Sequence, residues 1–272
     1  MAAPLTRVER KAWRNGAQSV GERAIPEETA VAFTYNGGSY AVMMATPSDL
    51  HDFATGFSLT EGIISSEQDI ERLDILEEPA GVELRMWLRE PFARALIERR
   101  RHQAGPTGCG LCGIESLTEA LRVSPLVPEG LRFTPDDISR ALGALAPLQP
   151  LNRETRAVLA AAFWQPGAGI LAVREDVGRH NALDKLCGAL SRQAIVGSSG
   201  MLVMTSRVSV ELIQKAAVAG IPVLVAVSAP TALAVRTAEA ACMTLVAVAR
   251  DDGFEVFTHP QRVAESAPAA SL

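Results

Sequence analysis

A pair of cysteines spaced as Cys-x-x-Cys and surrounded by glycines is the part of this sequence best suited to chemistry. Cys109 and Cys112 are flanked by Gly108, Gly110 and Gly113. This spacing brings both sulfur atoms to one place, and a positive charge nearby lowers the pKa of a thiol towards neutrality. Because glycine has no Cβ, the backbone here can bend sharply and another molecule can approach closely.

A block of positive charge lies just before the cysteines. Residues 99–102 read Arg-Arg-Arg-His, and such charge favours a thiolate over a thiol and attracts an anionic ligand. The block also falls at the end of a predicted helix, where arginines complement the helix dipole. The two explanations are compatible.

Such a pair is compatible with three chemistries, namely zinc binding, redox cycling and sulfur transfer. A loop with two inert cysteines is the less favoured alternative. A structural zinc needs four ligands, but Cys187 and Cys242 stand alone and no histidine pair has ligand spacing. The zinc deaminase signature requires H-x-E followed by P-C-x-x-C. No histidine here has Glu two residues later, and Gly108 replaces the proline. We therefore expect no structural metal, while redox and sulfur chemistry both remain open.

The composition limits the setting in which this chemistry occurs. The 272 residues are 48% hydrophobic, enough for one large domain or two moderate ones. Four cysteines are too few for a disulfide scaffold and indicate a reducing compartment. The net charge of −5 argues against nucleic-acid binding, and no apolar run has membrane-spanning length. The basic residues near the N-terminus lack the apolar run of a secretory signal, so we expect a cytoplasmic protein.

Strand and helix patterns predict a smaller α+β domain at 27–103, after a flexible arm at 1–26. Asn36-Gly37 is a strong hairpin signal between two strands, and Ser48 is the predicted N-cap of the following helix. Strands are expected over 29–35, 39–45, 73–76 and 82–88, with helices from 48 to about 60 and after residue 91.

The second half, 104–263, has the pattern of a larger α/β domain, followed by a disordered tail at 264–272. Thr134, Pro135 and two aspartates predict a helix start. Apolar strands alternating with helices predict a parallel sheet covered on both faces. Helices are expected from 134, over 153–163, 182–190, 210–219 and 231–241, and strands over 170–173, 201–204, 223–227, 244–249 and 254–257.

Polar clusters follow four of these strands, at 174–181, 205–209, 228–231 and 250–253. Ligands of open parallel sheets bind at the carboxyl ends of the strands, and free N–H groups at helix N-termini favour phosphate. Arg179, Arg207 and Arg250 could add charge-assisted hydrogen bonds to it. Glycine-rich nucleotide fingerprints are absent.

Each cluster also has a structural interpretation. Asn181 and Asp184 fit an N-cap and N3 pair, Asp176 could pair with Arg179, and 250–253 could be an ordinary hairpin turn. Because four clusters are predicted on one sheet edge, a ligand site there is the favoured interpretation.

Several of these segments, in the same order, resemble the FdhD family of formate dehydrogenase accessory sulfurtransferases. The most specific match is 174–185, Arg-Glu-Asp-Val-Gly-Arg-His-Asn-Ala-Leu-Asp-Lys, and the resemblance covers roughly residues 25–263. The other matching segments are 43–47, 61–64, 107–113, 215–222, 226–231 and 258–262.

The resemblance implies a cytoplasmic homodimer with a cytidine-deaminase-like three-layer αβα domain behind a smaller α+β domain. It implies a protein that takes sulfur from a cysteine desulfurase as a persulfide on Cys109, with Cys112 beside it. The sulfur passes to a molybdenum cofactor with two molybdopterin guanine dinucleotides, before insertion into the catalytic subunit of formate dehydrogenase. The matching cofactor-binding segment is Val248, Ala249, Arg250, Asp251, Asp252 and Gly253.

One position departs from the family pattern. The family commonly has Thr-Gly-Gly-x-His-Ala where this chain has residues 155–160, so Leu159 replaces a histidine. Leucine can neither exchange a proton nor form a side-chain hydrogen bond. Two alternatives stay open beside sulfur transfer. One is a non-catalytic cofactor-binding chaperone, which the missing histidine favours slightly, and the other is a dithiol oxidoreductase that uses the cysteine pair.

Overall fold

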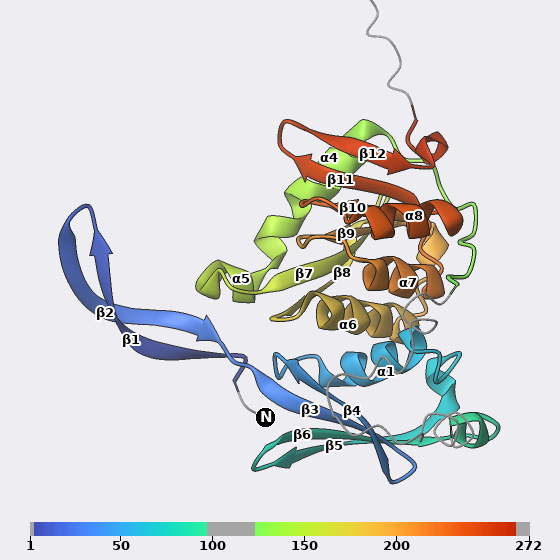
Figure 1. Cartoon of the computed structure of the whole chain (residues 1–272), viewed down its shortest axis with the longest axis horizontal. Coiled ribbons are helices and arrows are strands. Elements are labelled where there is room, and N and C mark those ends of the chain that lie inside the picture. Colours follow the sequence, from blue (N-terminus) through green and yellow to red (C-terminus); the bar gives the residue numbers. More distant parts are fainter. Residues whose placement is uncertain (1–2, 97–122, 265–272) are drawn as a thin grey trace, which may run out of the picture.

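Two sheets of different size, with helices between them, form the body of the chain (Figure 1). The computed structural model describes residues 3–96 and 123–264. The mixed α/β class expected from the sequence is confirmed. No helix within these ranges has the length and apolarity needed to span a membrane. The predicted boundary at residues 103 and 104 lies outside the described residues.

The N-terminal lobe is a four-stranded sheet with helix α1 (Leu50–Thr60) packed on it. Its strand order is β4-β3-β6-β5, with β3 and β6 parallel, and helix α1 supplies Phe53 and Phe57 to a core that contains Phe33. Helix α1 begins one residue later than predicted, because Asp49 rather than Ser48 is the N-cap residue. The elements are β3 (Thr29–Tyr35), β4 (Gly38–Ala45), α1 (Leu50–Thr60), η1 (Glu67–Asp69), β5 (Ile70–Glu78) and β6 (Gly81–Leu88).

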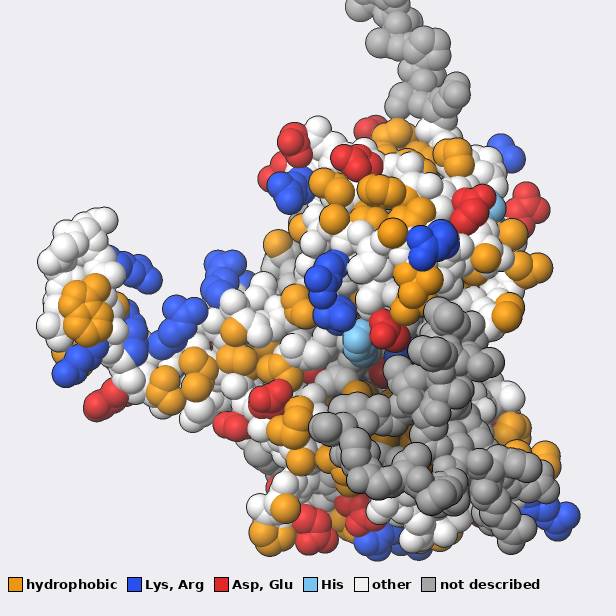
Figure 2. Space-filling view, in the orientation of Figure 1, with side chains coloured by type: hydrophobic (Ala, Val, Ile, Leu, Met, Phe, Trp, Pro, Cys, Tyr) orange, Lys and Arg blue, Asp and Glu red, His pale blue; other side chains and the backbone are white. Residues whose placement is uncertain are grey.

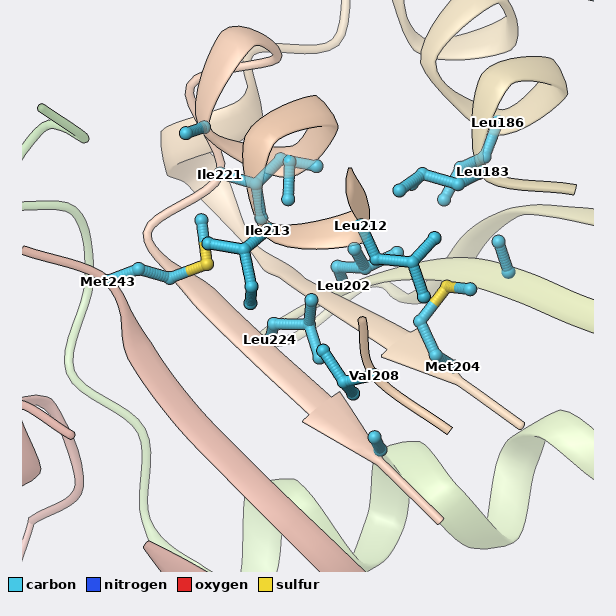
Figure 3. Close-up of a cluster of buried hydrophobic side chains, with 14 of the residues drawn as sticks. Leu183, Leu186, Leu202, Met204, Val208, Leu212, Ile213, Ile221, Leu224 and Met243 are labelled. Atoms are coloured by element: carbon cyan, nitrogen blue, oxygen red, sulfur yellow. The ribbon is translucent and has the colours of Figure 1, made fainter. Parts of the chain in front are cut away.

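The C-terminal lobe has three layers, with a six-stranded sheet in the middle. Helices α6, α7 and α8 pack on one face, where the cluster of Figure 3 includes Leu183, Leu212 and Leu224. Helix α4 covers the other face through Ile138 and Leu145. The elements are α4 (Pro135–Leu145), η2 (Ala146–Leu148), α5 (Pro150–Thr155), β7 (Leu159–Gln165), β8 (Gly169–Asp176), α6 (Arg179–Arg192), η3 (Gly197–Ser199), β9 (Met201–Met204), α7 (Val210–Val218), β10 (Val223–Ala226), α8 (Ala232–Ala240), β11 (Thr244–Arg250), β12 (Gly253–Thr258) and η4 (Pro260–Arg262).

The large sheet is mixed, so the prediction of a parallel sheet is wrong in part. The order is β12-β11-β10-β9-β7-β8, and only β9, β10 and β11 are parallel neighbours. Strand β7 is antiparallel to both β8 and β9. Strand β8 therefore runs in the same direction as β9, and the carboxyl ends of β8, β9, β10 and β11 share one edge, as the polar clusters predicted.

The helix predicted over 153–163 is wrong. A short helix, α5, ends at Thr155, and strand β7 begins at Leu159. Three consecutive alanines, 160–162, favour a helix by propensity. However, β7 lies inside the sheet and residues 160–164 are buried, and burial on both faces outweighs that weak preference.

The predicted flexible arm is instead an antiparallel ribbon. Strands β1 (Leu5–Arg14) and β2 (Ala17–Pro26) pair along their full length, and the ribbon projects from the body in Figure 1. Its turn is Asn15-Gly16, with φ values of 51° and 79°, as a two-residue hairpin loop requires. The ribbon lacked a clear alternation of apolar and polar residues, and for this reason the sequence pattern missed it.

The two lobes meet where α1 crosses α6 at two glycines. A Cβ added to Gly56 would lie 1.7 Å from the carbonyl oxygen of Asp184, and one on Gly188 would lie 1.9 Å from that of Asp52. The helix backbones are therefore in direct contact, which only glycine permits.

We predict that Gly56→Ala lowers the free energy of unfolding by about 3 kcal/mol or more, because the new methyl group forces the helices apart. Gly143→Ala, on the exposed side of α4 with open space around the added Cβ, is the matched control and should stabilise by about 0.5 to 1 kcal/mol. Urea unfolding of both variants measures the difference. Equal changes in the free energy of unfolding for the two substitutions would contradict the direct backbone contact between α1 and α6.

Candidate functional site

The four polar clusters form a continuous rim along the carboxyl edge of the large sheet. His180 Nε2 lies 3.3 Å from the Ser209 hydroxyl, which joins the starts of α6 and α7. The Thr231 N–H donates to the carbonyl of Val208, and the Val248 N–H lies 3.4 Å from the carbonyl oxygen of Ser228. Backbone and side-chain contacts thus connect all four strand ends, and we call this edge the rim.

Asp176 fixes the position of the first rim segment. Its Oδ1 accepts hydrogen bonds from the Gly178 N–H and from the Asn181 side chain, at 2.8 and 2.9 Å. Asn181 also donates to the carbonyl of Met44 in β4. The predicted N-cap role of Asn181 is therefore wrong, because Gly178 is the N-cap residue of α6.

A fully buried ion pair lies beneath this segment. Asp176 pairs with Lys185 at 2.6 Å, and both side chains have no exposed surface. Lys185 also donates to the carbonyl of Thr46, while the Thr46 N–H donates to Asp176. The predicted partner of Asp176, Arg179, is thus replaced by Lys185, and the pair links the N-terminal lobe to the rim.

Two further ionic groups cross the boundary between the lobes. Lys215 of α7 pairs with Asp184 at 2.9 Å and with Glu61 at 3.1 Å, and it donates to the Thr60 hydroxyl. Burial alone would lower the pKa of Lys215, but the charges of Asp184 and Glu61 outweigh it and raise that pKa.

The third group is centred on Asp52 of α1. Its carboxylate accepts hydrogen bonds from Arg174 of β8 at 2.8 Å and from Arg192 of α6 at 2.7 Å. Like the Lys215 group, it holds the N-terminal lobe against the elements that carry the rim.

His180 is a neutral imidazole on the rim. Burial and the nearby charge of Arg179 lower the pKa of His180 to about 4, although Glu211 lies 3.7 Å away. Its side chain is 32% exposed. At neutral pH it can therefore donate or accept a hydrogen bond without carrying charge.

Arg179 presents a donor that no described residue satisfies. Its Nε is buried and has no hydrogen-bond partner among residues 3–96 and 123–264. The side chain extends from the first turn of α6, where unpaired backbone N–H groups also favour an anion. This orphan donor fits a phosphate-bearing ligand at the rim.

The predicted cofactor-binding segment, 248–253, forms the last part of the rim. Val248 has a φ of 52°, a left-handed conformation that is an outlier for a β-branched residue, and it lies where the pairing of β11 and β12 shifts register. Ala249 is buried, whereas Arg250, Asp251 and Asp252 are exposed. Arg250 pairs with Gly253 across the β11–β12 turn, so the hairpin interpretation is confirmed, and it leaves these side chains accessible.

The other predicted site residues are distributed as follows. Arg207 is exposed between β9 and α7. Cys109, Cys112 and the basic block at 99–102 lie outside the described residues. Cys187 lines a cavity of about 410 Å³ between the lobes, but burial raises its pKa to about 12, so its thiol is not a nucleophile.

Leu159 lies on the rim rather than inside a helix. It is paired with Asp176 at the start of β7, and the next N–H, of Ala160, donates to the Thr205 hydroxyl. Arg156 has a φ of 57°, where the family pattern has glycine, the residue that favours this conformation. The departure from the pattern therefore removes a polar group from the rim itself.

A family model described as the FdhD/NarQ family matches residues 26–264. The chain belongs to this family. Two curated relatives in the family are named sulfur carrier protein FdhD. The protein from Agrobacterium fabrum is 53% identical over 262 residues, covering 96% of this chain and 97% of the relative. The protein from Brucella abortus is 51% identical over 245 residues, covering 90% of this chain and 91% of the relative.

A solved structure agrees with the fold of this FdhD/NarQ family member. It is described as a formate dehydrogenase accessory protein from Desulfotalea psychrophila, with a TM-score of 0.76 and 24% identity, covering 96% of this chain and 100% of that one. At this identity the likeness supports the fold alone. The cytidine-deaminase-like detail stays a prediction.

We predict that His180 makes folding stability fall as the pH is lowered from about 6.5 to about 4. The unfolded chain binds this proton at the ordinary pKa of 6.5, whereas the folded chain binds it only near 4. The unfolded state therefore holds more protons in this window, so stability rises with pH there and levels off above it.

The measurement compares unfolding free energies at about pH 7 and about pH 5 for the wild type and His180→Gln, together with an NMR titration of the imidazole. The variant should lose less stability on acidification. An imidazole that titrates near its ordinary pKa would show that His180 is not held neutral by the rim.

Proposed function

We propose that this protein is a sulfur carrier that serves formate dehydrogenase. Sulfur is carried as a persulfide on Cys109, taken from a cysteine desulfurase and delivered to a molybdenum cofactor with two molybdopterin guanine dinucleotides. Support comes from the family, from the names of the curated relatives and from the fold. The observation that carries most weight is a phosphate-compatible rim in a chain that also has a Cys-x-x-Cys motif.

The loading step is a thiol–disulfide type exchange. The Cys109 thiolate attacks the outer sulfur of the donor persulfide, a new S–S bond forms on Cys109, and the donor leaves as a thiolate. No electrons are gained or lost overall. Cys187 is unsuited to this step because its thiol stays protonated at neutral pH.

Release of the sulfur assigns a role to the second cysteine. The Cys112 thiolate attacks the inner sulfur of the Cys109 persulfide, a disulfide between the two cysteines forms, and hydrosulfide leaves towards the acceptor. A cellular dithiol then reduces the disulfide.

The rim is the proposed binding site for the cofactor, which is the acceptor substrate. The Arg179 Nε without a partner, the starts of α6 and α7, and the exposed Arg207 and Arg250 all suit the phosphates of the guanine dinucleotides. The neutral His180 adds a hydrogen bond without repelling or neutralising these charges.

Three further features belong to the same proposal. The protein acts in the cytoplasm, forms a homodimer, and contacts both a cysteine desulfurase and the catalytic subunit of formate dehydrogenase. They follow from the family resemblance.

Mass spectrometry after incubation with a cysteine desulfurase and cysteine tests the carrier role. We expect one added sulfur on the wild type, mapped to Cys109 and removed by a thiol reductant. Cys109→Ala should remain unmodified. Cys242→Ala, which removes a cysteine outside the Cys-x-x-Cys motif, is the matched control and should still gain the sulfur.

A chain that keeps bare thiols throughout, yet binds cofactor, would instead be a non-catalytic chaperone. A disulfide that exchanges with thioredoxin without any sulfur gain would indicate a dithiol oxidoreductase.

Binding of guanosine diphosphate tests the rim separately. We expect Arg250→Ala to weaken binding by about tenfold or more, because a charge-assisted hydrogen bond is lost. Arg236→Ala removes an equal charge from the exposed side of α8 and should leave affinity unchanged. If calorimetry gives the two variants equal affinities for guanosine diphosphate, Arg250 does not contact the ligand.

A further inference from the structure

A second group of arginines lies away from the rim, where the ribbon meets α5. A pocket of about 310 Å³ is lined there by Arg7, Arg10, Glu22, Arg23, Ala24 and Glu154. Figure 2 shows that basic side chains gather along the ribbon. Strands β1 and β2 carry five basic residues against two glutamates, although the whole chain is acidic.

Arg10 has a donor that the described residues leave unused. Its Nη1 is buried and has no hydrogen-bond partner among them. Arg10 faces Gly21 across the ribbon, so the residue opposite has no side chain that could accept. A buried donor without an acceptor costs free energy, and an acceptor from solution would remove that cost.

Arg23 and Arg7 complete the pocket. Arg23 Nη2 donates to the carbonyl of Thr155 at 3.1 Å, which holds this guanidinium against α5. Arg7 Nη2 lies 3.5 Å from Glu154, and both side chains are largely exposed. This is the one ion pair among the described residues that line the pocket. Glu22 also lines it but pairs with none of the three arginines, so most of the guanidinium donors remain available.

The alternation of the strands adds a repulsion that a ligand would relieve. Arg10, Arg14 and Arg23 lie on the same face of the ribbon, and that face carries no acidic residue. Arg10 and Arg23 are diagonal neighbours, a distance at which long side chains interact. Like charges at this spacing are unfavourable unless an anion lies between them.

We propose that this pocket binds a phosphate-type oxyanion, either inorganic phosphate or the phosphate group of a larger molecule. Arg10 and Arg23 from one face of the ribbon and Arg7 from the other offer donors in several directions, which suits the tetrahedral oxygens of a phosphate better than the flat pair of a carboxylate. The bound anion would join the ribbon to α5. Because a two-stranded ribbon is only marginally stable alone, binding should also order the ribbon.

The test is an NMR titration of the full-length ¹⁵N-labelled protein with inorganic phosphate at constant ionic strength. We expect saturable shifts at the amides of residues 7–10, 21–24 and 154, with slower hydrogen exchange along the ribbon. Arg10→Gln should weaken this binding by about tenfold or more, since a charge-assisted donor is lost. Arg236→Gln should leave it unchanged.

Site-resolved shifts separate the pocket from the rim, so the result does not depend on the proposed function. Guanosine monophosphate and acetate serve as further ligands. Shifts with the nucleotide at the same amides support the proposal and indicate a phosphate ester as the natural ligand. Acetate binding as tightly as phosphate, or phosphate shifts that persist in Arg10→Gln, would overturn it.

Discussion

The buried contact between the two lobes is the constraint on which the rest of the structure depends. Asp176 and Lys185 form an ion pair without solvent, and backbone groups of Thr46 complete its hydrogen bonds. Removing one partner of such a pair leaves an uncompensated buried charge. The same Asp176 carboxylate holds the Gly178 N–H at the start of α6, so the geometry of the rim depends on the N-terminal lobe.

This coupling gives the small lobe a part in the proposed function. Helix α1 reaches α6 at Gly56 and Gly188, where no other residue fits. The ionic groups around Asp52 and Lys215 reinforce the crossing. These contacts hold the starts of α6 and α7 in place before any ligand arrives. Under the proposed function, such preorganised donors bind the phosphate-bearing acceptor at lower cost.

Local signals predicted much of this arrangement and long-range contacts explain the remainder. The helix start at Thr134 forms as its capping residues indicate, and the four polar clusters do share an edge. The sequence predicts a helix where the strand at 159–165 lies, because the helix propensity of alanine is a local property and does not include burial inside a sheet. The sequence also does not predict the ion pair of Lys185, because its partners Asp176 and Thr46 come from a strand and from the other lobe.

A double-mutant cycle on Asp176 and Lys185 tests this account most directly. Lys185→Met should lower the free energy of unfolding by about 3 to 5 kcal/mol and shift the amide resonances of residues 177–181. Adding Asp176→Asn should recover part of that loss, because the uncompensated charge is gone while an amide oxygen remains to accept from Thr46, Gly178 or Asn181. If Lys185→Met costs less than about 1 kcal/mol, as for an exposed pair, and leaves those resonances unmoved, the buried pair does not position the rim.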